Sequence, residues 1–366
     1  MPPTESLSPG LTKAFVQLIV ERTGFKIREN DQKVFKDTLY RRAKLTGSDF
    51  LEEYYQLLAT QTEKSHQEWD SLIVEITNTE SFFFRDKGQF NLLKNYIFPD
   101  LIKRRADTKT IRICSAGCST GEEPYSIAMF LRDFIPNIEE WDITILGVDI
   151  NSAAIKSAKA GIYRPWSFRG IDRHIQNRFF EEVNEQYHIS ASIKQMVKFQ
   201  IGNLLDSSFL DPFSDIQEMD LILCRNVFIY FSDSAVETVL NKFYNALSPL
   251  GYLLVGHAEL YSQNPSNFSI KMFEESIAYQ RPVDGVAGLR SSPALAPLRT
   301  VPRLRTTADA DSQPIDSSLA AADIKMQRAA LNLLRQLPAD TRMAKFGNLT
   351  ASELILQFEQ DLNKVD

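Results

Sequence analysis

Residues 111–127, IRICSAGCSTGEEPYSI, have the types and spacing that could hold a ligand. A β-branched run leads into a turn of small residues and then into apolar residues at helical spacing. Gly117 and Gly121 bracket the turn. There the backbone could approach a ligand closely, and the following helix would direct its first N–H groups at it. The pattern predicts a strand, a loop and a helix around a bound cofactor.

Two carboxylates, Glu122 and Glu123, follow Gly121 directly, and no Lys stands where a phosphate-binding loop has one. They would repel a phosphate and attract positive charge. The ammonium and sulfonium groups of S-adenosylmethionine meet that requirement. The alternative is an ordinary tight turn whose acidic residues interact with the helix dipole. The spacing alone leaves both interpretations open.

Two further strand ends carry polar residues. The strand at 143–149 ends on Asp149, which is placed to accept hydrogen bonds from ribose hydroxyls or, alternatively, to cap the next helix. Asn151 could provide the cap instead. The segment 219–231, MDLILCRNVFIYF, predicts a buried strand that ends in a polar bend, with Arg225 and Asn226 at the carboxyl edge of the sheet.

Strands and helices alternate along the middle of the chain, with helices expected at 121–134, 151–160 and 234–247. This alternation predicts an α/β fold with a parallel, doubly wound, Rossmann-like sheet and a ligand site outside the carboxyl ends of the strands. An insertion spans about 161–203. Its end, QYHIS then QMVKFQIG, has the alternation of a β-hairpin.

The flanking regions are expected to be helical. Residues 11–75 predict an all-α domain, residues 283–318 a linker rich in Pro, Ala, Arg, Ser and Thr, and residues 319–366 a short helical tail. A basic cluster in the first domain is either a solvated face or a docking surface for an acidic partner. It consists of Lys33, Lys36, Arg41, Arg42 and Lys44.

Three consecutive aromatic residues, Phe82 to Phe84, precede Arg85 and Asp86. The aromatic run could be core packing between domains. Arg85 is harder to explain in that way, because a guanidinium beside buried rings requires a carboxylate partner. It is therefore a candidate clamp for a substrate carboxylate.

The composition excludes several classes of protein. The 366 residues are 43% hydrophobic and 24% charged, as in a soluble globular protein, and the net charge of −6 argues against nonspecific nucleic-acid binding. No apolar run has the length of a membrane span, and the start of the chain lacks a signal-peptide pattern, so we expect a cytoplasmic protein. Three Cys and four His show no metal-ligand spacing.

Over residues 11–282 the chain resembles the CheR-type protein-glutamate O-methyltransferases of bacterial chemotaxis. The resemblance implies a helical domain at 11–75 and an S-adenosylmethionine-dependent methyltransferase domain at 76–282, with a small β-subdomain inserted at about 161–203. The motifs that carry it, in order, are TNTESFFFRD, SAGCSTGEEPYS, LGVDIN, AGIYRPWSFRG, GNLLD, CRNVFIYF and LSPLGYLLVGHAE.

The resemblance also implies roles for individual residues. Arg85 and Tyr230 would flank the transferred methyl group. Glu122, with Glu123 as the less favoured candidate, would meet the methionine amine of the cofactor, and Asp149 would hold its ribose. Residues expected to border the cofactor elsewhere are Thr79, Ser81, Arg85, Gly117, Asn203, Leu204, Arg225 and Asn226. Thr79 stands where the family commonly has Asn, a departure from the family pattern at which a polar contact could survive.

The implied reaction transfers a methyl group from S-adenosylmethionine to glutamate side chains of chemoreceptor cytoplasmic helices, giving methyl esters and S-adenosylhomocysteine. A glutamate carboxylate is already ionised at neutral pH, so no general base is required. Positioning in line and desolvation would supply the catalysis. The alternatives are a methyltransferase of another protein or small-molecule carboxylate, and a scaffold that only binds cofactor, in which Arg85 or Tyr230 would be lost.

Two surfaces could dock the receptor. The basic cluster could attract an acidic helix, in which case reversing the charges of Arg41 and Arg42 would raise the Michaelis constant for receptor. Alternatively, a hairpin between Tyr187 and Ile201 could pair its edge strand with a receptor tail.

Overall fold

The computed structural model describes residues 8–206, 216–257, 259–260, 263, 265–273, 276–283, 342–343 and 349–350. The chain forms two units, Met1–Ala296 and Pro297–Asp366. In the second unit the described residues are an antiparallel pair, β11 (Arg342–Met343) and β12 (Leu349–Thr350). The predicted linker and the rest of the predicted helical tail lie outside the described residues.

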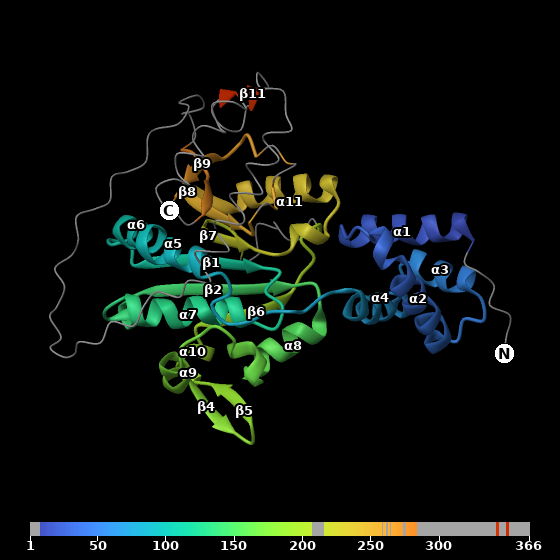
Figure 1. Ribbon diagram of the computed structural model, residues 1–366, viewed down its shortest axis with the longest axis horizontal. Coiled ribbons are helices and arrows are strands. Elements are labelled where there is room, and N and C mark those ends of the chain that lie inside the picture. The colour runs from blue at the N-terminus through green and yellow to red at the C-terminus, as the bar shows by residue number, and fades with distance from the viewer. Residues whose placement is uncertain are drawn as a thin grey trace, which may run out of the picture. The chain divides into compact units, whose positions relative to one another are not determined.

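The first described elements are four α-helices that pack against one another (Figure 1). Apolar residues at helical spacing, such as Phe15, Ile19, Leu39 and Leu72, are fully buried in their common core. Ser8 caps the first helix and Thr62 the fourth. The predicted all-α N-terminal region is thus confirmed as α1 (Pro9–Thr23), α2 (Gln32–Thr46), α3 (Leu51–Ala59) and α4 (Glu63–Ile76).

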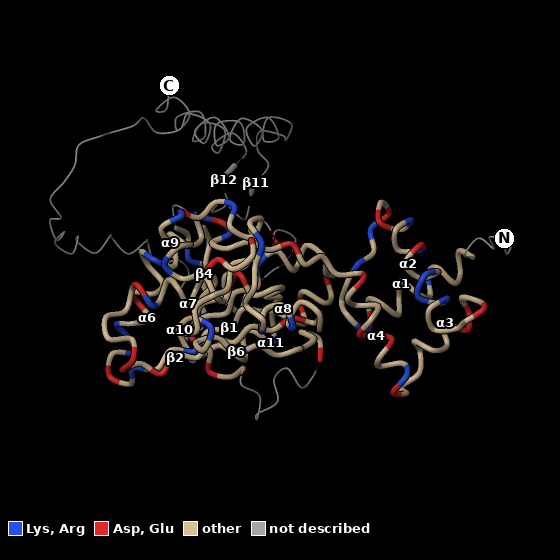
Figure 2. The backbone as a smooth tube through the Cα atoms, turned by 90° about the horizontal axis from the view of Figure 1, so that it is seen from below, with Lys and Arg blue, Asp and Glu red and all other residues tan. Residues whose placement is uncertain are grey.

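Two residues of the predicted basic cluster, Arg41 and Arg42, form ion pairs within this helical bundle. Arg42 contacts Glu68 at 2.6 Å and Glu75 at 3.2 Å, and Arg41 pairs with Glu75. Glu68 is buried and also accepts a hydrogen bond from Tyr54 at 2.7 Å. Lys and Arg positions alternate with Asp and Glu across the bundle (Figure 2). Both arginines therefore join α2 to α4, although 56% of the Arg41 side chain stays exposed, against 14% of Arg42. That reversing their charges weakens receptor docking stays a prediction.

The central sheet has seven strands in the order β6-β2-β1-β7-β8-β10-β9. The first five are parallel, which confirms the predicted doubly wound sheet. An antiparallel pair, which the sequence pattern did not predict, completes one edge. The strands are β1 (Thr110–Ala116), β2 (Asp142–Asp149), β6 (Val197–Ile201), β7 (Met219–Cys224), β8 (Leu247–Val255), β9 (Ser269–Met272) and β10 (Ile277–Gln280).

Both faces of the sheet are covered, and alternation along each strand divides the core in two. From β1, Ile111 and Ile113 pack with α5 to α7, whereas Cys114 and Ala116 pack on the other face with α11. The helices around the sheet are α5 (Lys87–Leu92), α6 (Phe98–Arg104), α7 (Glu122–Phe134), α8 (Ser152–Ala160) and α11 (Asp233–Ala246). No helix in the described part of the chain is long and apolar enough to cross a bilayer.

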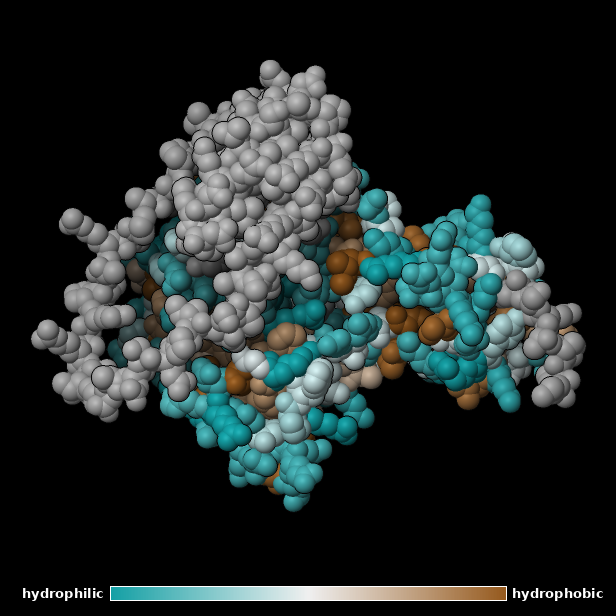
Figure 3. Space-filling view, viewed as in Figure 1, coloured by the Kyte–Doolittle hydropathy of each residue, from teal (hydrophilic) through white to brown (hydrophobic). Residues whose placement is uncertain are grey.

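The insertion holds a separate three-stranded antiparallel sheet in the order β3-β5-β4. Its hairpin is β4–β5, whose visible face is mostly hydrophilic (Figure 3). The predicted hairpin between Tyr187 and Ile201 is wrong, because β6 joins the main sheet beside β2. Period-two alternation does not specify the partner of a strand. The elements are β3 (Ile162–Tyr163), α9 (Arg173–Phe179), β4 (Phe180–Val183), β5 (Gln186–Ile189) and α10 (Ala191–Lys194).

Candidate functional site

A cavity of about 430 Å³ opens at the carboxyl ends of β1, β2 and β7. Gly117, Asp149 and Arg225, which end or follow these strands, all line it. Further walls come from the end of α4 and the segment that follows it, up to Arg85, and from the end of α1, the start of α2 and the segment between them. The cavity thus lies at the edge of the sheet where the strand pattern predicted a ligand site, and it is large enough for a small cofactor.

The turn after β1 has the backbone that its glycines require. Gly117 has φ +75°, and a Cβ atom there would lie 2.3 Å from Cγ2 of Val227. The N–H groups of Gly117 and Cys118 both donate to the carbonyl of Val148, at 2.8 and 3.0 Å. Only glycine fits this close approach. The backbone of the turn is therefore fixed against the end of β2.

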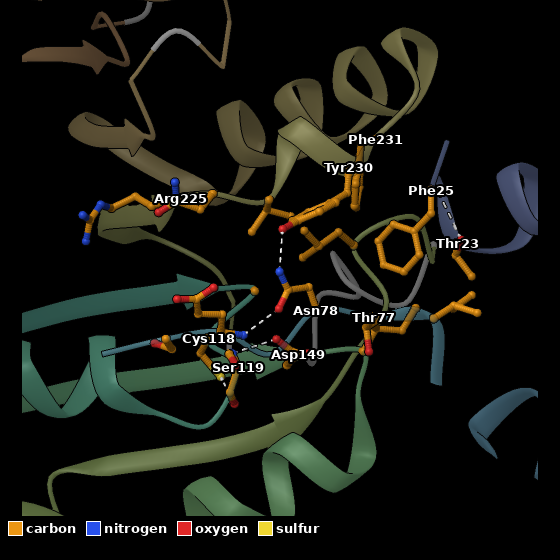
Figure 4. Close-up of a pocket in the computed structure, with 18 of the residues that line it drawn as sticks. Thr23, Phe25, Thr77, Asn78, Cys118, Ser119, Asp149, Arg225, Tyr230 and Phe231 are labelled. Carbon is orange, nitrogen blue, oxygen red and sulfur yellow. Dashed lines mark hydrogen bonds between the residues drawn. The ribbon is translucent and has the colours of Figure 1, made fainter. Parts of the chain in front are cut away.

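Asp149 is held as a hydrogen-bond acceptor at the rim of this turn. One carboxylate oxygen accepts the backbone N–H of Ser119 at 2.7 Å (Figure 4), and the other accepts the backbone N–H of Asn151 at 2.8 Å. Burial raises the pKa of Asp149, and the backbone N–H donors oppose that shift. Asn151, not Asp149, caps α8 by accepting the N–H of Ala154. The capping interpretation of Asp149 is therefore wrong, and its remaining lone pairs are available to a ligand.

The two glutamates at the start of α7 point to different surroundings. Glu122 is 2% exposed and accepts hydrogen bonds from the hydroxyls of Thr120 at 2.7 Å and Ser167 at 3.1 Å. It does not line the cavity, whereas Glu123 does. Glu123 accepts the Ser115 hydroxyl at 2.7 Å. The geometry thus brings to the cavity the glutamate that the sequence interpretation ranked second.

Glu122→Gln should stabilise the ligand-free protein at mildly alkaline pH. Burial, the main cause, raises the pKa of Glu122 above its ordinary value. Stability from this carboxyl is therefore fully present below the unfolded-state pKa of about 4.3 and is lost as pH rises through the folded-state pKa. Thermal unfolding across pH should show a higher midpoint for the Gln variant, with the gap closing toward acid.

The matched control is Glu182→Gln on the exposed strand β4, which should leave the midpoint unchanged at every pH. Because Glu122 lies outside the cavity, affinity of the Glu122→Gln variant for S-adenosylhomocysteine should stay within about twofold of the wild type, as for most positions without ligand contact. A large loss of affinity would instead place Glu122 in the binding site.

Arg225 is the centre of a buried polar network. Its side chain is 3% exposed and pairs with Glu123 at 2.9 Å. Its Nε atom donates to Gln89, and its Nη2 atom donates to the backbone carbonyl of Arg85. Arg225 therefore lines the cavity while orienting both Glu123 and the backbone of Arg85. The following residue, Asn226, has φ +60° and donates its N–H to Glu259 at 3.0 Å.

The segment 78–85 contributes both to the core and to the cavity wall. Phe83 is fully buried against Tyr163 and Phe168, whereas Phe82 lines the cavity together with Ser81 and Arg85. Arg85 donates to the carbonyl of Glu80 at 3.1 Å. Thr79 does not line the cavity; its carbonyl accepts the Ser119 hydroxyl at 2.8 Å. A buried anchor thus positions the residues that face the cavity.

Tyr230 lies opposite this segment and is held by the segment between α1 and α2. The N–H of Lys26 donates to the carbonyl of Tyr230 at 2.8 Å, and Phe25 forms a β-bridge with Phe231. The Tyr230 hydroxyl accepts a hydrogen bond from Asn78 at 3.1 Å (Figure 4). Asn203 and Leu204 also line the cavity, and the Asn203 amide donates to the carbonyl of Arg22 at 2.7 Å.

Sequence reasoning missed several residues of this site. Asn78, Ser119 and Phe25 line the cavity, and Gln89 and Glu259 support it through hydrogen bonds. Asn78 had a local signal, because an Asn two residues before a polar turn residue is typical of an Asx-turn. Gln89 and Glu259 had none, since their partners are distant in the sequence.

The donors and acceptors around the cavity fit S-adenosylmethionine. Asp149 offers carboxylate oxygens to a diol, Glu123 offers one to an ammonium group, and the turn at Gly117 permits close approach of the ligand to backbone. Apolar walls from Val148, Leu204 and Val227 suit a purine ring. The cavity is thus lined by the two carboxylates Asp149 and Glu123 as well as by apolar side chains, a set that suits a cofactor with an ammonium group, a diol and a purine ring.

Comparison with known proteins identifies the family. A model of the CheR methyltransferase, SAM binding domain, matches residues 79–277, more than half of the chain. Chemotaxis protein methyltransferase 2 of Vibrio cholerae is 32% identical over 280 residues, covering 76% of this chain and 95% of that protein. Chemotaxis protein methyltransferase of Borreliella burgdorferi is 32% identical, with coverages of 67% and 86%.

The chain is also similar to a protein that is not named for chemotaxis. The probable biofilm formation methyltransferase WspC of Pseudomonas putida is 28% identical over 300 residues, which cover 82% of this chain and 68% of that protein. The glycine turn, the acidic residues at the cavity and these matches agree with one another. The chain belongs to the CheR methyltransferase family and is an S-adenosylmethionine-dependent methyltransferase.

Proposed function

We propose that this enzyme methylates the side-chain carboxylates of glutamate residues in the cytoplasmic helices of chemoreceptors. One observation carries the proposal: Arg85 and Tyr230 line the same cavity as Glu123 and Asp149. A cofactor held by the two carboxylates would thus lie beside a guanidinium that can bind an acidic side chain. Relatives of this chain are named as chemotaxis protein methyltransferases, which supports a chemoreceptor as the substrate.

The positions of the side chains support the following roles. Asp149 holds the ribose and Glu123 the methionine amine, while Ser81, Gly117, Asn203, Leu204 and Asn226 border the remaining cofactor surface. Three of the candidates act indirectly. Arg225 orients Glu123, Thr79 fixes the Ser119 turn through its carbonyl, and Glu122 packs beneath the turn.

The bound cofactor supplies an electrophilic methyl group on a sulfonium. The acceptor glutamate is already ionised at neutral pH, so the residues of this chain need not remove a proton. Arg85 binds the acceptor carboxylate and brings one of its oxygens in line with the methyl carbon. The rings of Phe25, Phe82 and Tyr230 exclude water from that approach.

Lys33 and Lys36 of α2 flank Val34 and Phe35 in the sequence, two residues that line the cavity. Reversing both to Glu should raise the Michaelis constant for receptor several-fold, leave affinity for S-adenosylhomocysteine unchanged and flatten the salt dependence of the rate, because exposed charges act over about 8 Å and mainly on encounter. Initial rates across ionic strengths measure this.

Lys198→Glu is the control, because this lysine is exposed on β6 and distant in sequence from α2. If the double reversal leaves the kinetics unchanged, docking belongs elsewhere. The second candidate surface is the exposed edge strand β4 of the inserted sheet, which can pair with a receptor tail. A β4 variant that loses receptor methylation while the α2 variant retains it would decide for that edge.

The experiment that tests the function uses S-adenosylmethionine labelled on its methyl group and membranes that carry chemoreceptors. We expect label in the receptor band and its release as methanol by mild base, because methyl esters hydrolyse easily. Membranes without receptors, and small carboxylic acids in their place, should remain unlabelled. Equal labelling of small acids would favour a small-molecule methyltransferase, and cofactor binding without transfer would favour a regulatory scaffold.

A further inference from the structure

The side-chain amide of Asn78 links the segment after α4 to Tyr230. Its Nδ2 atom donates to the Tyr230 hydroxyl oxygen at 3.1 Å, and its Oδ1 atom accepts the backbone N–H of Glu80 at 2.9 Å (Figure 4). Asn78 and Tyr230 both line the cavity. The amide therefore connects a backbone turn on one wall to a phenol on the opposite wall.

The hydrogen bond from the backbone N–H of Glu80 fixes which end of the Asn78 side-chain amide faces Tyr230. A backbone N–H only donates, so it must meet the amide oxygen, and the NH₂ group must then face the phenol. The Tyr230 oxygen is consequently the acceptor. Its own hydrogen is not used in this bond and is available to a group in the cavity.

We propose that Asn78 is a positioning residue for methyl transfer, which fixes the Tyr230 ring and directs the O–H hydrogen toward the acceptor carboxylate. The inference rests on the proposed function. In that reaction one carboxylate oxygen forms a bond to the methyl carbon, the carbon–sulfur bond breaks, and its electron pair goes to sulfur. No proton moves.

The direction of the Asn78–Tyr230 hydrogen bond matters for this step. With Asn at 78, the phenol can donate to the second, non-attacking oxygen of the acceptor and hold the carboxylate in line. With an acceptor at 78, the phenol hydrogen would turn away from the cavity. The hydroxyl would then present only lone pairs, which repel the substrate carboxylate.

Two substitutions separate this role from a role in the backbone turn. Asn78→Ser and Asn78→Asp both keep a side-chain oxygen that can accept the Glu80 N–H. The Ser side chain is one bond shorter than that of Asn, so its hydroxyl does not reach Tyr230, and the Asp variant replaces the donor with an acceptor. We expect kcat to fall about threefold for Ser and roughly tenfold for Asp, the range of one lost or reversed hydrogen bond.

Affinity for S-adenosylhomocysteine, measured by calorimetry, should stay within about twofold for both variants. In a Tyr230→Phe background neither substitution should lower kcat further, because the hydroxyl is already absent. Thermal unfolding of the ligand-free variants tests the same coupling between Asn78 and Tyr230 without any measurement of turnover. Asn78→Ser should lower the thermal midpoint in the wild type and not in the Tyr230→Phe background.

Several results would overturn the proposal. Wild-type kcat in the Asp variant, or an equal loss of kcat in the Tyr230→Phe background, would show that Asn78 does not act through Tyr230. A loss of product affinity equal to the loss of kcat would place Asn78 in the cofactor site. If the wild-type enzyme fails to methylate receptor, the proposed function fails instead, and the thermal coupling still tests the hydrogen bond.

Discussion

Arg85→Ala is expected to reduce kcat for receptor methylation on the order of a hundredfold, because an acceptor carboxylate without its clamp is misplaced by about an ångström or more. Affinity for S-adenosylhomocysteine should change by less than about threefold, since Asp149 and Glu123 still hold the cofactor. Tyr230→Phe should also lower kcat. Single-turnover rates and calorimetry on the same preparations measure both quantities.

Arg169→Ala is a matched control, because Arg85 and Arg169 both lie beside the Phe82 ring, with Arg85 Cζ 5.6 Å from its centroid. Arg169 lies over Phe82, with Cζ 4.0 Å from the ring centroid, and pairs with Glu80 at 2.9 Å, but it does not line the cavity. We expect it to retain most of the turnover. If Arg85→Ala loses only cofactor affinity, Arg85 belongs to the cofactor site and the acceptor must be held by another group.

Asp149→Ala should weaken binding of S-adenosylhomocysteine by about 1.5 to 3 kcal/mol, or roughly 10- to 150-fold, the range for charge-assisted hydrogen bonds to a diol. The loss should be equally large for adenosine, which carries the ribose and lacks the methionine part. Calorimetric titration with both ligands measures the two losses.

Glu123→Gln provides the complementary comparison, because it should weaken S-adenosylhomocysteine and leave adenosine nearly unaffected. Thermal unfolding of both variants shows how far each change disturbs the turn, since Asp149 also accepts the N–H groups of Ser119 and Asn151. Unchanged affinity for adenosine in the Asp149→Ala variant would remove the ribose assignment.

The features that the sequence predicted correctly are local. Gly117 follows its strand at the position where only glycine fits, and Asp149 and Arg225 lie at strand ends because the β-strand and helix patterns place them there. The parallel core of the sheet follows from the same alternation of strands and helices. Family motifs then added Tyr230, whose position depends on Phe25 and Lys26 far away in the chain.

Other features of the site and fold depend on partners that local patterns do not specify. Adjacent helical residues point about 100° apart, so whether Glu122 or Glu123 faces the cavity depends on how α7 packs. Arg42 looked like part of a basic surface because Glu68 and Glu75, its partners, lie on another helix. Strand β6 alternates as a hairpin strand would, yet pairs with β2.

The most direct test of the central claim is to locate the transferred methyl group. A purified receptor cytoplasmic fragment is incubated with the enzyme and S-adenosylmethionine, digested, and analysed by mass spectrometry before and after mild base. We predict methyl esters on glutamate side chains that base removes and that the Arg85→Ala enzyme forms far more slowly. Methyl groups on lysine or on a backbone amine, stable to base, would contradict the account.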